Sequence, residues 1–85
     1  MNRGRWERKV KELLEMIAKA LVNNPDRVQV HAVEGEEATL LELRVHPSDL
    51  GKVIGRKERM AKSTRIILGT VGMKVRRRVT VEILE

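Results

Sequence analysis

The sequence predicts a small α+β domain with the element order helix-strand-strand-helix-helix-strand. Three features carry this prediction: a segment near the start with helical spacing of its apolar residues, three segments in which apolar and polar residues alternate, and a glycine between two further helical segments. The chain has 85 residues, of which 41% are hydrophobic, which is enough for one domain with a modest core. We expect a single domain over residues 1–85, with residues 1–4 as a loose N-terminal extension and with the helices packed on one face of a three-stranded sheet.

The first helix is predicted over residues 5–22. Its apolar residues recur at helical spacing, at Trp6, Val10, Leu13, Leu14, Ile17 and Leu21. Charged residues occupy the face between them. The helix is expected to stop before Pro25, because a proline disfavours helical geometry in the residue that precedes it. Trp6 is the one aromatic residue of the chain, and its place in the apolar stripe predicts a core position.

Two strands are predicted next, in residues 27–32 and 40–45, and a third in residues 78–83. Apolar and polar residues alternate in each, and this period of two marks a strand with one buried face. The acidic residues around Gly35 predict a hairpin loop at 34–37, and we expect this loop to point away from any phosphate partner. His31 falls in the polar phase of its strand, so we expect it to be exposed to solvent.

Two helices joined at Gly55 are predicted between the second and third strands. The first begins at 46–49, where Pro47 suits a first helical turn and Asp49 can cap free amides. The second runs over about 58–73, with glycines that weaken its last turns. Gly55 has no Cβ, which lets a ligand approach the backbone, and amides at a helix start attract anions. The segment therefore predicts a seat for a phosphate backbone.

The basic residues of the chain are concentrated in its second part. The formal charge of the whole chain is +6, whereas residues 1–50 carry 8 basic and 9 acidic residues and residues 51–85 carry 10 basic and 3 acidic residues. Such a split is typical of a polyanion partner, most often nucleic acid, although composition alone fits a solvated basic surface equally well. The clustering of cations around Gly55 favours nucleic acid.

Composition also excludes several classes of site. The chain has no cysteine, so no disulfide or thiolate zinc site supports it, and its two histidines are too few and too far apart for a metal site of their own. We expect no cofactor and no small-molecule substrate. Without Phe or Tyr, the chain lacks the aromatic platforms on which many RNA-binding domains stack bases. No apolar run reaches membrane-spanning length and no signal peptide is visible, so we expect a cytoplasmic protein without membrane contact.

The order of elements, with a glycine loop between the two middle helices, resembles a type II KH domain. More closely, the sequence is similar to the small stand-alone bacterial KH proteins of the KhpA (YlqC) group. The likeness runs in register from about residue 10 to the end, and four stretches carry it: residues 17–26, 33–37, 41–45 with 47–55, and 78–83.

This resemblance implies a non-catalytic protein that binds single-stranded RNA. KH domains clamp the backbone of about four nucleotides with a Gly-x-x-Gly loop, and an aliphatic groove beside the loop takes the bases. By position, the loop here consists of Gly55, Arg56, Lys57 and Glu58. The resemblance places Val53 and Ile54 at the entrance of the groove and Lys52, Arg59 and Lys62 around the phosphate path. It also implies a homodimer, or a heterodimer with a larger KH-containing protein, formed partly through the helix after the loop.

Glu58 departs from the pattern, because members of the group usually have glycine there. Its Cβ takes space where the backbone would approach a phosphate, and its carboxylate repels an anion. Arg56, Lys57 and Arg59 nevertheless keep the loop net positive. An equally good structural explanation is that a carboxylate in the first turn stabilises the helix through its dipole. We expect a weaker or altered grip on RNA.

Two hypotheses for the function stay open from the sequence, and two others are disfavoured. The first is an RNA-binding module of low sequence specificity that acts as an RNA chaperone or post-transcriptional regulator. The second is a KH-fold dimerisation module whose RNA binding is weakened by Glu58. An enzyme is disfavoured because no nucleophile–base pair or convergent carboxylate pair is visible. A membrane-surface protein is disfavoured because the cations do not lie along one amphipathic helix. The cationic cluster at 74–78 is the alternative RNA site if the loop is not used.

Overall fold

A computed structural model describes residues 3–35, 37–70 and 78–85 of the chain. These residues form, in chain order, α1 (Arg3–Leu21), the short 3-10 helix η1 (Pro25–Arg27), β1 (Gln29–Glu34), β2 (Ala38–Arg44), the 3-10 helix η2 (Pro47–Asp49), α2 (Leu50–Ile54), α3 (Lys57–Thr70) and β3 (Arg78–Leu84). The predicted order of helices and strands is confirmed.

The three strands form one mixed sheet in which β2 is central. β1 and β2 are antiparallel, with Val30 opposite Leu43, as expected of strands joined by a hairpin loop. β2 and β3 are parallel, with Leu41 opposite Val81. A parallel pair needs a crossover connection, and here α2 and α3 provide it. The two middle helices are therefore part of the link that sets β3 beside β2.

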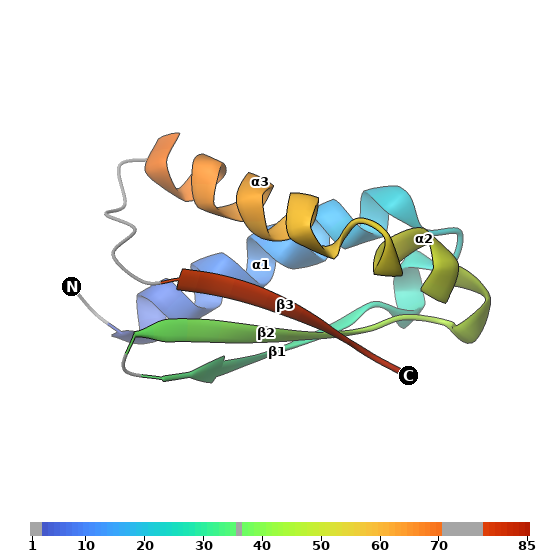
Figure 1. The fold of residues 1–85 in the computed structure, drawn as a ribbon, viewed down its shortest axis with the longest axis horizontal. Coiled ribbons are helices and arrows are strands. Elements are labelled where there is room, and N and C mark those ends of the chain that lie inside the picture. Colours follow the sequence, from blue (N-terminus) through green and yellow to red (C-terminus); the bar gives the residue numbers. More distant parts are fainter. Residues whose placement is uncertain (1–2, 36, 71–77) are drawn as a thin grey trace.

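The helices pack on one face of this sheet, as the sequence predicted (Figure 1). α1 and α3 lie across the same face, and α2 lies at the end of the sheet opposite the β1–β2 loop. The core between the layers is aliphatic apart from Trp6, and its completely buried side chains include Val10, Leu14, Leu41, Leu43 and Leu68. The other face of the sheet is more polar, with His31 opposite Glu42 and Glu42 opposite Glu82. His31 is exposed, as expected.

Trp6 lies in the core, which confirms its predicted position. Only 4% of its surface is exposed, and its indole Nε1 donates a hydrogen bond to the Thr39 hydroxyl at 3.2 Å. Thr39 is completely buried in β2. A buried polar group without a partner is unfavourable, so this bond satisfies two groups that would otherwise be unpaired in the core. It joins the first helix to the central strand.

The element boundaries differ from the predicted ones at several places. α1 begins at Arg3, two residues before the predicted start of the first helix. Val28 and Val45 are buried as predicted but lie just outside β1 and β2. α3 is described to Thr70, and the predicted end at 73 lies outside the described residues. In the described part of the chain, every helix is too short or too polar to cross a bilayer.

The bond between Trp6 and Thr39 predicts a measurable coupling between the two residues. Trp6→Phe leaves the hydroxyl unpaired and Thr39→Val leaves the indole N–H unpaired, so each lowers the free energy of unfolding by about 1–3 kcal/mol. The double variant loses less stability than the sum of the two single losses, by about 0.5–3 kcal/mol, because neither polar group is then left buried without a partner. Urea unfolding measures all three. Trp6→Phe combined with Val33→Ala, at an exposed position on β1, gives an additive control, and additivity in the first pair would contradict the coupling.

Candidate nucleic-acid interface

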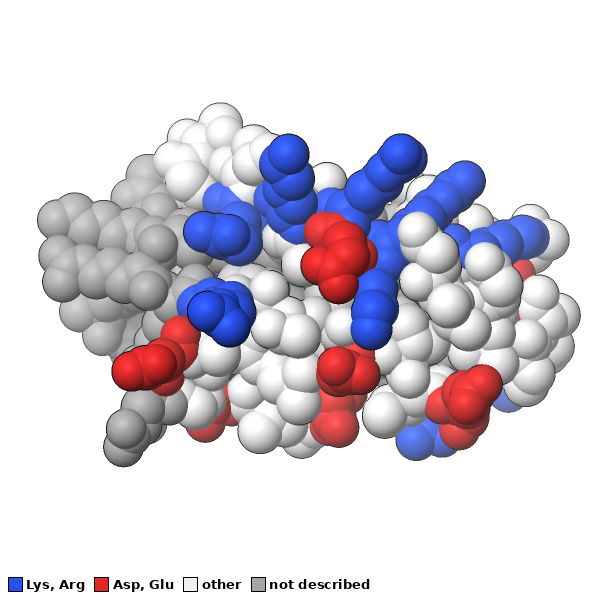
Figure 2. Space-filling view, in the orientation of Figure 1, with Lys and Arg blue, Asp and Glu red and all other residues white. Residues whose placement is uncertain are grey.

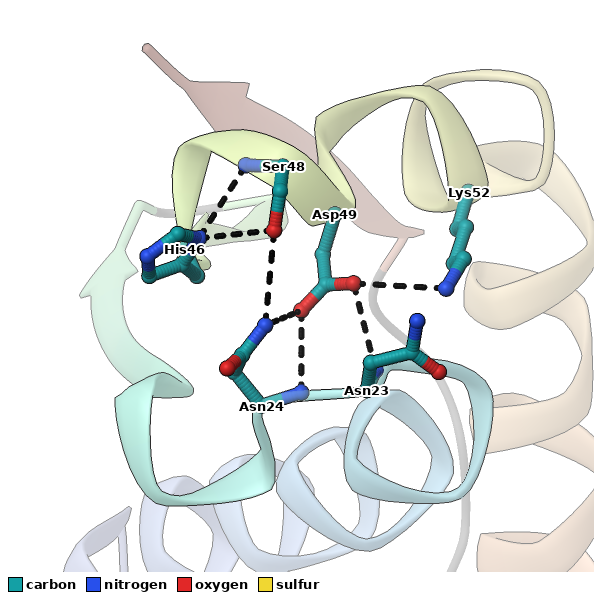
Figure 3. Close-up of polar contacts among 6 residues, drawn as sticks. All are labelled: Asn23, Asn24, His46, Ser48, Asp49 and Lys52. Carbon is teal, nitrogen blue, oxygen red and sulfur yellow. Dashed lines mark hydrogen bonds and ion pairs between the residues drawn. The ribbon is translucent and has the colours of Figure 1, made fainter.

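The position of α2 depends on Asp49, the last residue of η2. Its side chain is completely buried and its carboxylate accepts hydrogen bonds from three N–H groups: the backbone amides of Asn23 at 3.1 Å and Asn24 at 3.0 Å, and the Asn24 side-chain amide at 2.9 Å (Figure 3). Asn23 and Asn24 follow directly on α1. The carboxylate therefore ties the end of the first helix to the start of α2.

The charge of Asp49 is stabilised by these contacts. The hydrogen bond from the Asn24 side chain, helped by the two backbone amides and by Lys52, lowers the pKa of Asp49 to about 2, although burial acts in the opposite direction. The ammonium of Lys52 lies 3.5 Å from Oδ1. Beside them, Nδ1 of His46 accepts a hydrogen bond from the backbone amide of Ser48 at 3.1 Å. The helix cap predicted for Asp49 is wrong: its side chain makes no capping hydrogen bond to α2 and binds the amides of the loop after α1, whereas His46 caps η2.

Gly55 and Arg56 form the tight turn between α2 and α3. The Arg56 amide donates to the Val53 carbonyl at 3.0 Å, and the Arg56 carbonyl accepts from the Met60 amide at 2.9 Å. Gly55 has φ −74° and ψ −3°, a geometry open to any residue, and a Cβ built there would meet nothing within 4 Å. The fold itself does not require glycine at this position. Because Gly55 has no side chain, the space in front of the turn is left unfilled.

A groove runs between α3 and the free edge of β3. Its volume is about 520 Å³, within the range of protein sites that hold small organic groups. One wall consists of α3 residues and the other of β3 residues, in full Lys57, Glu58, Ala61, Lys62 and Arg65 facing Arg78, Val79, Thr80 and Val81. The groove therefore combines cations, one carboxylate and the edge of a strand.

The structure places the nine predicted site residues in three different surroundings. Lys57, Glu58 and Lys62 line the groove, so they come together as expected. Arg56 and Arg59 are exposed on or next to the turn but are not part of the groove wall. These two cations lie where a phosphate could reach them from outside the groove.

The other predicted residues lie before the turn and have different surroundings. Val53 has no exposed surface and packs in the core, so the structure does not place its side chain at a groove entrance. Ile54 is 49% exposed. Lys52 is not in the groove wall, since its ammonium pairs with Asp49. Lys52 and Val53 thus hold α2 in place, while Ile54 and Gly55 are presented to solvent.

Six groove residues were missing from the predicted site, and three of them have polar side chains: Arg65, Arg78 and Thr80. Arg65 lies three positions after Lys62 and seven after Glu58, so the spacing along one helix face was the signal that could have found it. Thr80 became visible only when the sheet order placed β3 at the edge next to α3. Arg78 belongs to the cluster named as an alternative site, and the rest of that cluster lies outside the described residues.

The electrostatics of this face are positive with a local interruption. Basic side chains gather along α3 and at the start of β3, with an acidic side chain among them (Figure 2). The groove wall carries four cations, those of Lys57, Lys62, Arg65 and Arg78, against the single carboxylate of Glu58. Most acidic side chains seen in this view lie on the sheet side of the molecule. The groove is thus the place on this face best suited to a polyanion.

Neither the groove nor the rest of the described chain offers a catalytic metal site. No group of three or more His, Asp or Glu side chains among the described residues could hold a metal ion. The groove contains a threonine but no histidine or second carboxylate that could activate it.

Comparison with models of protein families identifies the family of this chain. The model of the KhpA/KhpB KH domain matches residues 11–83. The chain belongs to this family. The family match covers every element except the first eight residues of α1 and the last residue of β3, so the KH fold and the resemblance noted from the sequence are confirmed.

Curated relatives are similar over most of the chain. The RNA-binding protein KhpA of Aquifex aeolicus is 49% identical over 76 residues, which cover 89% of this chain and 96% of that protein. The RNA-binding protein KhpA of Borreliella burgdorferi is 50% identical over 87% of this chain and 90% of its own length. The KhpA of Clostridium acetobutylicum is 51% identical over 88% of this chain and its full length. No solved structure matches the chain. Membership in this KH family confirms the expectation that the chain is not an enzyme.

The Asp49 contacts predict a specific pH dependence of stability. The folded-state pKa of about 2 lies below the ordinary value of 3.8, so the carboxylate stabilises the fold fully above pH 3.8, and this contribution is lost as the pH falls toward 2. Asp49→Asn keeps the shape but removes the charge, so the variant is less stable at neutral pH and loses less stability on acidification. Thermal unfolding between neutral pH and pH 2 measures this.

Asp26→Asn is the matched control, because Asp26 is exposed on η1. It should leave the pH profile of the parent nearly unchanged. Parallel profiles for the parent and Asp49→Asn would contradict the assigned role of the buried carboxylate.

Proposed function

We propose that this KH-family chain binds single-stranded RNA in the groove between α3 and β3, without catalysis and with low sequence specificity. The observation that carries the proposal is the convergence of four cations from two elements on one groove beside an open turn. The name of its relatives, RNA-binding protein KhpA, supports the same function. We further propose a role as an RNA chaperone or post-transcriptional regulator in the cytoplasm, since such a role is compatible with binding without strong base selection.

The groove suits a single strand better than a duplex. Lys62, Arg65 and Arg78 are exposed and can follow a phosphate backbone as point charges along the groove. Among the described residues β3 pairs only with β2, so its outer edge presents backbone donors and acceptors toward the groove, within reach of unpaired base edges. A duplex would keep those base edges occupied.

The turn before α3 extends this surface. The open space at Gly55 lets a phosphate approach the backbone, and Arg56 and Arg59 flank the approach. Ile54, half-exposed beside the turn, offers an aliphatic contact for a base in a chain that has no Phe or Tyr. Together these residues extend the binding surface beyond the groove toward α2.

RNA binding through the groove predicts a salt dependence that two substitutions reduce. Lys62→Ala with Arg65→Ala removes two phosphate contacts, so the slope of log affinity against log salt becomes shallower by about 1.4, at about 0.7 per contact. Fluorescence anisotropy with a short uridine-rich RNA across salt concentrations measures the slope. The control, Lys11→Ala with Lys19→Ala, removes the same charge from exposed positions of α1 outside the groove. If the control weakened binding equally, the groove would not be the site.

A second function, pairing of KH domains through α3, is favoured by one observation. Ile66 is 58% exposed on α3, an unusual position for a large aliphatic residue on a helix whose other exposed positions are mainly charged or polar. We propose that this position contributes to a homodimer or to a heterodimer with a larger KH-containing protein. Ile66 is not among the residues that line the groove, so pairing and RNA binding use different side chains of α3.

Pairing through α3 predicts that Ile66→Lys shifts the chain toward the monomer. A charge at a buried interface position is unfavourable because it is desolvated without a partner. Light scattering at micromolar concentration measures the mass. Val33→Lys places the same charge at another exposed aliphatic position, on β1, and should leave the mass unchanged. A parent that is monomeric both alone and with its KH-containing partner would overturn this second function.

A further inference from the structure

We propose that Glu58 makes the groove select bases that carry N–H donors on their pairing edge, guanine above all, and disfavour uracil. The inference rests on the proposed binding of single-stranded RNA. It assigns a positive role to the residue that departs from the usual loop pattern. On this view the groove is weakly selective and not indifferent to sequence.

Glu58 is placed to contact a ligand in the groove. It is exposed, lies in the first turn of α3 and forms part of the groove wall that faces β3. Within the described part of the chain, its carboxylate makes no hydrogen bond or ion pair, although four cations share the groove. The carboxylate is therefore available to a ligand.

The charges along the groove are ordered. Glu58, Lys62 and Arg65 lie on one face of α3, and at 1.5 Å per residue Lys62 and Arg65 follow Glu58 by about 6 Å and about 10 Å along the helix axis. A phosphate is attracted to the cations and repelled by the carboxylate. An RNA strand held by Lys62 and Arg65 therefore lies at lower energy with a base, and not a phosphate, against Glu58.

The chemistry of a carboxylate then decides which base is favoured. An ionised carboxylate only accepts hydrogen bonds. Guanine presents two adjacent donors on its pairing edge, N1–H and the N2 amino group, which match the two carboxylate oxygens. Cytosine and adenine each present one amino group, and carboxylate pairing with the cytosine amino group is a known mode of base reading. Uracil presents one N–H between two carbonyl oxygens, which repel the carboxylate.

The test compares oligonucleotides that differ at one base. The probes are uridine RNAs of about eight nucleotides, twice the length that a KH loop clamps, with a central guanosine, inosine or uridine. Inosine lacks only the N2 amino group of guanosine. We expect the parent to bind the guanosine probe at least about fivefold more tightly than the uridine probe, the lower bound for a bidentate contact, with inosine between them.

Three variants complete the test. Glu58→Gln and Glu58→Gly should bring the guanosine-to-uridine ratio toward one, and Glu58→Gly should bind the uridine probe more tightly than the parent because the repulsion is removed. Glu82→Gln, an exposed position on β3 outside the groove wall, should keep the parent ratio. Circular dichroism checks that each variant is folded.

The outcomes separate this inference from the function on which it rests. Salt-sensitive binding with a ratio that Glu58 substitutions leave unchanged would overturn the role of Glu58 alone. Absence of binding to every probe at low salt would overturn the proposed RNA-binding function itself. A ratio that falls equally in Glu82→Gln would show that general charge, and not the groove carboxylate, selects the base.

Discussion

The arrangement of the functional face depends on one buried carboxylate, that of Asp49. A buried charge is tolerated only when its lone pairs are occupied, and here three N–H groups and an ammonium surround it. The three N–H groups belong to Asn23 and Asn24 in the loop after α1, some 25 residues earlier in the chain. α2 has only five residues and is too short to be stable alone, so its orientation comes from this contact and from the burial of Val53. Because the turn at Gly55 follows α2 directly, the same contact also sets the position of this turn.

One face of α3 packs in the core, and the adjacent face lines the groove. Met60, Thr64 and Leu68 are buried against the sheet and α1, while Glu58, Lys62 and Arg65 line the groove beside them. The hydroxyl of Thr64 donates to the Met60 carbonyl, so the one polar side chain on the buried face has a partner within the helix. A rotation of the helix by one residue would bury a cation without a partner. Packing of the core thus sets which charges face the ligand.

Much of this fold was predictable from the sequence, because its signals are local. The alternation in β2 and β3 and the apolar stripe of α1 identified the elements, and the stripe placed Trp6 in the core. The surroundings of Lys52 and Val53 were not predictable in the same way. A lysine beside a glycine loop has the same local sequence whether it contacts RNA or a buried aspartate, and only the fold brings Asn23 and Asn24 to Asp49. Arg65 could have been found from its spacing along α3, whereas Thr80 required the sheet order, which is a property of long-range pairing.

The parallel pairing of β2 and β3 also links ligand binding to the folding of the whole domain. Its register joins Ala38 to Arg78, two residues separated by the entire crossover, and contacts of such long sequence separation form slowly. The two walls of the groove come from different parts of the chain, since α3 belongs to the crossover and β3 follows it. A partly folded chain with β3 detached has no groove. A ligand that bridges the walls consequently binds only the complete fold and stabilises the domain by mass action, so occupancy and global stability rise together.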